Sequence, residues 1–195
     1  MFHSLDAAKA SIEGLTKHGI VKDVLKSTSF KPAGVLSAEY PNHQAVAMGN
    51  TLPVSGTQEK PTVQFTPMEG YGPFSTSDLL TLVLTDPDAP SRTDKKWSEY
   101  CHYIESDIKM GKGGLLEGGK VLQPYVGPGP PKGTGPHRYV FLLYQQPSGV
   151  TCSSFTPIQD RPNWGYGSPA TGVDKWASEN KLKLVGANFF LAENK

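Results

Sequence analysis

Proline and glycine interrupt this chain at short intervals, and this spacing limits the possible folds more than any other feature of the sequence. The 195 residues include 21 glycines and 17 prolines, about a fifth of the chain against about an eighth in average proteins. Both residues are disfavoured inside helices and frequent in turns. The sequence therefore favours many short strands joined by turns over a helix bundle. We expect residues 1–195 to form a single, mainly β domain.

Three stretches predict the longest strands. Leu79–Thr85 is a continuous apolar run that ends at Asp86-Pro87, a pattern typical of a strand buried on both faces. Tyr100–Ile108 and His137–Gln145 predict two further strands. Shorter extended pieces are expected at Gly34–Leu36, Val46–Met48, Thr62–Thr66, Leu182–Val185 and Asn188–Leu191.

The helices are expected to be short and near the chain ends. Apolar residues recur at helical spacing from Leu5 to His18, with Gly19 suited to end the helix. Gly172–Asn180 predicts a second short helix that carries Trp176. Met110–Lys120 is rich in glycine and is expected to be a surface loop with little to pack.

The charge balance excludes some classes of partner. Nineteen basic and eighteen acidic residues give a net charge of +1, and no stripe of lysine and arginine could neutralise many phosphates, so a nucleic-acid partner is not expected. Cys101 and Cys152 lack metal-ligand spacing and are expected to be reduced. We find neither a leader pattern nor an apolar run of about 18 residues, so we expect a cytoplasmic protein without a transmembrane segment.

Polar residues gather where the predicted long strands meet loops. Asp86 and Asp88 follow the apolar strand, His102 lies on the second strand, and His137 opens the third. Side chains alternate along a strand, so His137 and Tyr139 should share one face about 7 Å apart while Arg138 points the other way. We interpret Arg138 and Arg92 as structural partners of carboxylates or carbonyls behind a pocket.

The loop before His137 adds a stiff wall to this cluster. Residues 126–136 alternate glycine with proline, so backbone can approach a ligand closely while the path of the loop stays rigid. A phosphate loop of the nucleotide-binding kind is excluded, because its spacing is absent and the prolines remove backbone donors. Asp86 beside an imidazole would favour the charged imidazole, which attracts phosphate or carboxylate groups. The cluster therefore predicts a small anion pocket.

Two long segments resemble the signature segments of phosphatidylethanolamine-binding proteins. They are Asp86-Pro87-Asp88-Ala89-Pro90-Ser91-Arg92 and residues 129–139, Gly-Pro-Pro-Lys-Gly-Thr-Gly-Pro-His-Arg-Tyr. Residues 97–102, 46–53 and 161–167 resemble the fungal carboxypeptidase Y inhibitor branch of that family. The resemblance implies a large central antiparallel sheet packed on a smaller sheet, with short peripheral helices at the termini. It also implies ligand-binding roles for Asp86, Trp97, Tyr100, His102, Gly129, Pro130, His137 and Tyr139.

The resemblance further implies a non-catalytic regulatory protein that inhibits a serine carboxypeptidase and binds a phospholipid head group or small anion. The apolar N-terminal end, Met1 and Phe2, is a candidate for contact with the protease. An alternative is a phospholipid-binding signalling adaptor that modulates a kinase or Ras-pathway protein. A third hypothesis, a metal-dependent hydrolase built on Asp86, Asp88, His102 and His137, lacks the familiar hydrolase motifs. We expect no cofactor and no metal, and a location that extends from the cytoplasm to the vacuole or a membrane surface.

Overall fold

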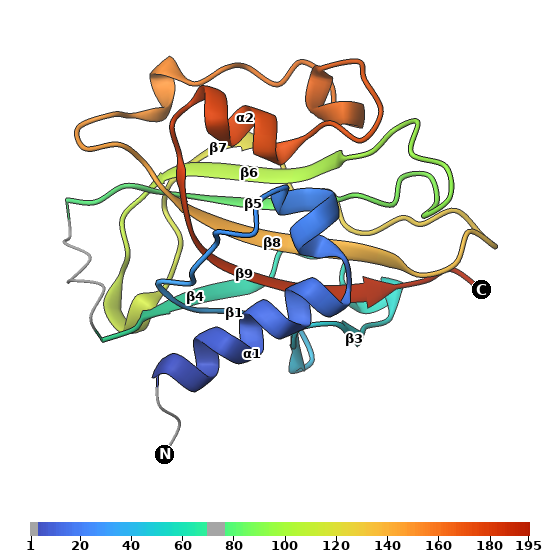
Figure 1. Ribbon diagram of the computed structural model, residues 1–195, viewed down its shortest axis with the longest axis horizontal. Coiled ribbons are helices and arrows are strands. Elements are labelled where there is room, and N and C mark those ends of the chain that lie inside the picture. The colour runs from blue at the N-terminus through green and yellow to red at the C-terminus, as the bar shows by residue number, and fades with distance from the viewer. Residues whose placement is uncertain (1–3, 70–76) are drawn as a thin grey trace.

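The computed structural model describes residues 4–69 and 77–195, and these residues form two β-sheets. The smaller sheet has the strand order β2-β1-β4, comprising Gln44–Ala45, Gly34–Tyr40 and Thr62–Pro67. The larger sheet has the order β3-β9-β8-β5-β6-β7, comprising Asn50–Thr51, Lys183–Ala192, His137–Gln145, Leu80–Asp86, Tyr100–Ile108 and Lys120–Gln123. All pairings are antiparallel except that of β3 with β9. The expected mainly β architecture is confirmed (Figure 1).

The centre of the large sheet is buried on both faces. Every residue of β5 is buried, as expected of an uninterrupted apolar run. On β8, Tyr139, Phe141 and Leu143 belong to the cluster that packs against the small sheet. Val140, Leu142 and Tyr144 belong to the cluster on the opposite face. This alternation places His137 and Arg138 on opposite sides of the sheet.

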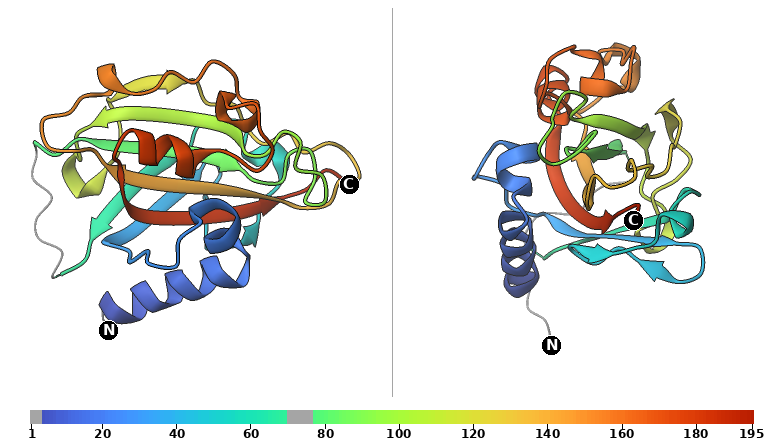
Figure 2. Two further views of the ribbon diagram at one scale, coloured as in Figure 1. Left: turned by 45° about the horizontal axis from the view of Figure 1, so that its top comes forward. Right: turned by 90° about the vertical axis from the view of Figure 1, so that its right-hand side faces the viewer.

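Helical segments cover the face that the small sheet leaves open. α1 (Ser4–Lys17) ends just before Gly19, whose φ of +72° is the left-handed conformation that glycine adopts readily. The π-helical turn η1 (Val21–Leu25) and α2 (Val173–Glu179) pack on this face, where Trp176 is fully buried. Figure 2 shows α1 and α2 flanking the large sheet, with the small sheet as a separate layer. Short 3-10 turns occur at Val54–Gly56 (η2), Lys112–Gly114 (η3), Cys152–Ser154 (η4) and Pro162–Gly165 (η5).

Three sequence expectations need correction. The extended piece expected at Val46–Met48 is not a strand, because the short strand β2 ends at Ala45 and Met48 has a φ of +46°. The stretch Met110–Lys120 is not a loop with little to pack, because Leu116 is 2% exposed and its backbone N–H donates to the Val63 carbonyl. The two pieces expected near the C-terminus form one strand, β9, which continues through Gly186 opposite Leu143. No helix in residues 4–69 and 77–195 is long and apolar enough to cross a membrane.

Candidate functional site

A pocket of about 200 Å³ lies where the end of β5 meets the beginnings of β6 and β8. It is lined by Asp86, Ala89, Pro90, Trp97, Tyr100, His102, Val126, Gly127, Gly129, Pro131, His137 and Tyr139. All but one of the ligand-binding residues expected from the sequence lie in this lining. The exception is Pro130, which is buried outside it, while its neighbour Pro131 takes that place. Met1 and Phe2 lie outside the residues that the structure describes.

An ion pair forms the inner wall of the pocket. His137 Nδ1 lies 2.9 Å from Asp86 Oδ2, and both side chains are buried. The other ring nitrogen, Nε2, lies 2.9 Å from Thr134 Oγ1, whose hydroxyl donates to the Pro131 carbonyl. Both ring nitrogens of His137 are therefore engaged, which fixes the orientation of its imidazole in the wall of the pocket.

The second imidazole, His102, is held differently. Its Nδ1 lies 2.7 Å from the Val126 carbonyl oxygen, to which it must donate. Burial lowers the pKa of His102 below its ordinary value of 6.5, although Asp86 and the Val126 carbonyl oppose that shift. His102 is therefore neutral at neutral pH, and its Nε2 is an acceptor. Asp86 therefore contacts one imidazole of the pocket, His137, while His102 bonds to a backbone carbonyl.

Aromatic rings complete the walls and the rim. Tyr139 stacks on His137 with ring centroids 6.2 Å apart and meets His102 edge-on at 5.3 Å. Tyr100 packs on the other side of His102 at 4.9 Å. Trp97 is 44% exposed at the rim, where Lys96 Nζ lies 4.8 Å from its ring centroid. The walls are thus apolar surfaces with a few polar groups, as is usual for small-ligand sites.

Asp88 and Arg138 lie behind the pocket, as the alternation along β8 predicted for Arg138. Arg138 is fully buried and makes two side-chain bonds to Asp88, Nη2 to Oδ1 at 2.8 Å and Nε to Oδ2 at 2.9 Å. Burial alone would raise the pKa of Asp88, but hydrogen bonds from Arg138 and Lys95 lower it to about 2. Arg138 Nη1 also contacts the His18 carbonyl at 2.8 Å and Asp23 Oδ2 at 2.9 Å. This pair therefore ties the segment after α1 to the sheet.

Arg92 donates to the same His18 carbonyl at 3.5 Å, in keeping with the structural role expected of it. Because Asp88 faces Arg138, the four residues of the metal-hydrolase hypothesis do not form one cluster. Within residues 4–69 and 77–195 no group of three or more histidine, cysteine, aspartate or glutamate side chains could hold a metal ion.

Two residues that position the pocket wall were not singled out from the sequence. Asn163 Nδ2 donates to the carbonyls of Lys96 and Ser98 at 3.0 and 2.8 Å, and its backbone N–H donates to Trp97. Arg161 Nη1 donates to the His102 carbonyl at 3.2 Å. Both residues belong to segment 161–167, which the sequence marked only through its family resemblance. Their roles could not be inferred from their residue types, because their side chains bond to backbone carbonyls that are distant in the sequence.

Replacing Asn163 tests this support. Asn163→Ala removes two hydrogen bonds and replaces asparagine, which tolerates the left-handed region, by alanine, which tolerates it less well, at a φ of +53°. We expect the free energy of unfolding to fall by about 2–4 kcal/mol, measured by urea denaturation. Asn163→Gly loses the same bonds, but glycine adopts the positive φ of residue 163 without strain. This variant should therefore be about 1 kcal/mol more stable than the alanine variant. Equal stability of parent and both variants would contradict this role.

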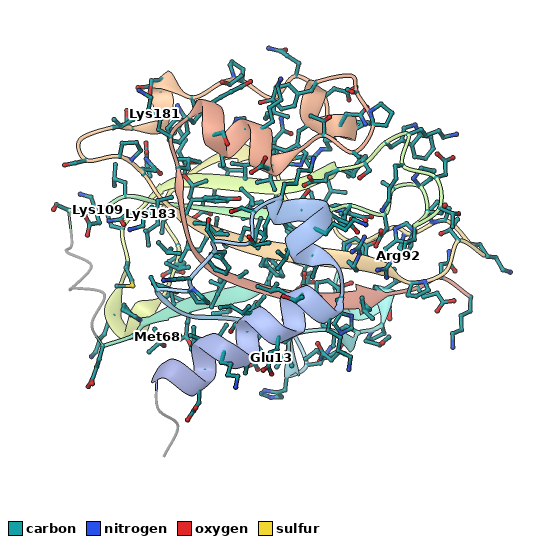
Figure 3. All side chains as sticks on the ribbon, viewed as in Figure 1. Glu13, Met68, Arg92, Lys109, Lys181 and Lys183 are labelled. Atoms are coloured by element: carbon teal, nitrogen blue, oxygen red, sulfur yellow. The ribbon has the colours of Figure 1, made fainter. Side chains whose placement is uncertain are left out.

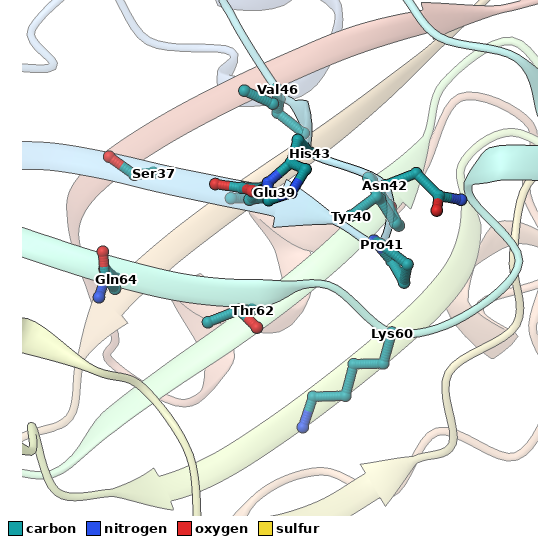
Figure 4. Close-up of a pocket in the computed structure, with 12 residues that line it drawn as sticks. Ser37, Glu39, Tyr40, Pro41, Asn42, His43, Val46, Lys60, Thr62 and Gln64 are labelled. Carbon is teal, nitrogen blue, oxygen red and sulfur yellow. Dashed lines mark hydrogen bonds and ion pairs between the residues drawn. The ribbon is translucent and has the colours of Figure 1, made fainter.

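A larger hollow, of about 570 Å³, lies on the outer face of the small sheet (Figure 4). The side chains across its floor, among them Ser37, Thr62 and Gln64, are exposed. Its charged groups are already paired, since Glu39 contacts His43 at 3.2 Å and Lys60 contacts Glu105 at 3.0 Å. The smaller pocket, which gathers buried polar groups, is therefore the better candidate site.

Comparison with known protein families agrees with this geometry. A family model described as phosphatidylethanolamine-binding protein matches residues 42–190. This chain belongs to the phosphatidylethanolamine-binding protein family. The matched range contains every pocket-lining residue named above, so the candidate site lies within the part of the chain that the family shares.

Individual relatives in the phosphatidylethanolamine-binding protein family are similar over almost the whole chain. The carboxypeptidase Y inhibitor of Saccharomyces cerevisiae is 52% identical, with 100% of both chains covered. A solved structure of carboxypeptidase Y inhibitor complexed with its cognate proteinase has a TM-score of 0.93 at 54% identity, covering 98% of each chain. A phosphatidylethanolamine-binding protein from Plasmodium vivax has a TM-score of 0.77 at 25% identity, covering 94% of this chain and 97% of that one. The resemblance drawn from the sequence is thus confirmed.

Proposed function

We propose that this protein is a non-catalytic inhibitor of a serine carboxypeptidase of the carboxypeptidase Y type. The observation that carries the proposal is its likeness to the carboxypeptidase Y inhibitor solved with its proteinase, at a TM-score of 0.93 and 54% identity. The likeness covers 98% of each chain, so the backbone that would carry an inhibitory surface is shared, and inhibition by a protein depends on surface complementarity. The protein acts where it meets the protease, in the cytoplasm or at the vacuole.

The pocket supports a second, separate binding role. The His137–Asp86 pair and the neutral His102 surround a hollow of about 200 Å³, a size suited to one small polar group. We propose that it binds a phosphate-like anion or a phospholipid head group. A signalling adaptor that acts on a kinase or Ras-pathway protein would use this pocket alone, without protease inhibition.

One experiment separates the two roles. We expect the purified protein to inhibit a vacuolar-type serine carboxypeptidase, and His137→Ala to inhibit it equally well, because we place the protease contact on the surface outside the pocket. The same variant should bind phosphate at least about tenfold more weakly, a loss of about 1.4 kcal/mol. Phosphate binding is measured by following the His102 resonances, and circular dichroism checks that the variant is folded.

The outcomes are distinct. Inhibition by neither protein would overturn the inhibitor proposal and leave the adaptor alternative. Loss of inhibition in folded His137→Ala would show that the pocket and the protease contact are coupled. His102 resonances that do not respond to phosphate in the parent would remove the anion-binding role.

The N-terminal end is the proposed point of entry into the protease. Met1 and Phe2 are apolar and precede α1, which begins at Ser4. We expect deletion of the first three residues to weaken inhibition at least about tenfold without changing thermal stability, because chain ends contribute little to the core. A matched control is Lys195 deletion at the other end. An unchanged inhibition constant after the N-terminal deletion would show that the protease contact lies elsewhere.

A further inference from the structure

A third hollow, of about 440 Å³, lies on the face of the large sheet that carries the helices. One wall is the segment after η1, and the other is α2 with the beginning of β9; we call this hollow the α2 groove. It is lined by Leu25, Ser27, Ser29, Phe30, Lys31, Tyr144, Asp174, Ala177, Ser178, Leu182, Lys183 and Leu184. The anion pocket is at the other end of β8 and on the other face. Figure 3 labels Lys183, which lines the groove, and Arg92, which follows the pocket-lining Pro90 in the chain, at opposite ends of the molecule.

Tyr144 lines the groove and lacks a polar partner. Its side chain is 5% exposed, and its hydroxyl makes no hydrogen bond with any residue in the described parts of the chain. Burial, with the carboxyl groups of Glu99 and Asp174, raises the pKa of Tyr144 well above 10. The hydroxyl therefore stays protonated and can donate. Because the hydroxyl oxygen is not fully buried, it reaches the hollow, where it can donate to a polar group of an occupant.

The two ends of the groove carry opposite charges. Asp174 lies in the first turn of α2, close enough to Lys26, the residue that ends η1, for the charge of Lys26 to act on it. Burial raises the pKa of Asp174, and Lys26 opposes that shift. Lys31 and Lys183 lie at the far end, because the Ala33 N–H donates to the Val185 carbonyl at 2.8 Å and aligns these two segments.

Apolar side chains cover the middle of the groove. Phe30, Leu182 and Leu184 are partly buried against the core cluster that contains Leu25 and Ala177. The volume falls within the range of about 300–1,000 Å³ that is usual for ligand sites. An occupant should therefore be apolar in its middle, positive at one end and negative at the other.

We propose that the α2 groove binds a short apolar peptide with free termini. The ammonium group pairs with Asp174, the carboxylate pairs with Lys31 and Lys183, and the Tyr144 hydroxyl donates to a peptide carbonyl. The apolar side chains of the peptide pack between Phe30 and Leu184. This site is independent of protease inhibition and of the anion pocket.

The test is a titration of ¹⁵N-labelled protein with leucyl-leucine, followed by amide chemical shifts. We expect shifts in residues 25–31, 174–178 and 182–184, with the His102 and His137 amides unchanged. N-acetyl-leucyl-leucine amide, which lacks both charges, and glutamyl-glutamate, which lacks the apolar middle, should each bind at least about tenfold more weakly. Equal binding of the capped peptide, shifts centred outside the groove, or no shifts at millimolar peptide would overturn the proposal.

Variants identify the contacts. Tyr144→Phe should weaken leucyl-leucine about fivefold to tenfold through loss of one hydrogen bond, without loss of thermal stability, since the hydroxyl has no partner in the described protein. Lys183→Gln should weaken it similarly, whereas Lys181→Gln, a nearby exposed lysine outside the lining, should not. Unchanged affinity in both Tyr144→Phe and Lys183→Gln would overturn the assignment even if the peptide binds.

Discussion

The contribution of Glu99 to the free energy of unfolding is expected to fall by about 3 kcal/mol as the pH rises from about 4.5 to about 7, and Glu99→Gln is expected to abolish that fall. Burial raises the pKa of Glu99 from 4.5 to about 7. A carboxyl with a raised pKa in the folded state stabilises the protein fully below its unfolded pKa. The contribution is then lost as the pH rises through the folded value.

The surroundings of Glu99 explain the size of the effect. Its side chain is completely buried, and Oε1 accepts from Thr85 Oγ1 at 2.9 Å and from the Val173 N–H at 3.3 Å. Oε2 has no hydrogen-bond partner among the described residues. Lys26 favours the ionised form and Asp174 disfavours it. Two bonds to one oxygen do not compensate for a buried charge whose other oxygen is unpaired.

Urea denaturation at a series of pH values measures this dependence. Glu99→Gln keeps an oxygen for Thr85 and Val173 but cannot ionise, so the stability of the parent minus that of the variant should fall by about 3 kcal/mol from about pH 4.5 to about 7. The difference cancels the contributions of other groups, among them His102, whose lowered pKa makes its own contribution rise over this range. The control is Glu179→Gln, an exposed carboxyl that should keep the pH dependence of the parent. A difference between parent and Glu99→Gln that stays constant with pH would refute the assignment.

Arg138→Met is expected to lower the free energy of unfolding by about 3–5 kcal/mol at pH 7. Methionine fills part of the space but leaves the buried Asp88 carboxylate with Lys95, whose side chain is 30% exposed, as its one paired cation among the described residues and with the backbone N–H of residue 138. It also removes the contacts of Arg138 with His18 and Asp23. Breaking one side of a buried pair leaves an uncompensated charge, which explains the large cost.

The pH dependence of the free energy of unfolding shows whether the loss in Arg138→Met comes from the Asp88 carboxylate that has lost Arg138. With Arg138 present, the pKa of Asp88 is about 2, so its contribution is present above the unfolded pKa of about 3.9 and is lost only as the pH falls towards 2. In Arg138→Met that acid-sensitive contribution should disappear. Adding Asp88→Asn to Arg138→Met should recover part of the loss at pH 7. Lys95→Met alone should cost no more than about 1 kcal/mol. If Lys95→Met cost as much as Arg138→Met, Arg138 would not be the main partner.

The long strands of the large sheet were predictable from the sequence. β6 and β8 have the bounds that Tyr100–Ile108 and His137–Gln145 suggested, because turn residues delimit both stretches. β7 and the buried Leu116 were not predictable. β7 forms by pairing with β6, and Leu116 bonds to Val63, which is distant in sequence, while the glycines around them resemble those of a loop.

The candidate site was predictable in its residue types but not in its electrostatics. Alternation along β8 was enough to place His137 and Tyr139 together and Arg138 apart. The sequence could not show that His102 bonds to a carbonyl rather than to Asp86. It also could not show that Asp88 turns away from the pocket, or that Asn163 supports the chain beside Trp97. Each of these depends on tertiary contacts that no short motif encodes.

The turn Asp86-Pro87-Asp88 divides its two carboxylates between different tasks: Asp86 serves the pocket, while Asp88 holds Arg138 and, through it, the segment that follows α1. Selection for a stable scaffold would thus retain Asp88 even in a descendant whose pocket no longer binds a ligand. A motif match in a distant genome is therefore evidence of shared architecture. Evidence of retained binding must come from the positions that face the hollow.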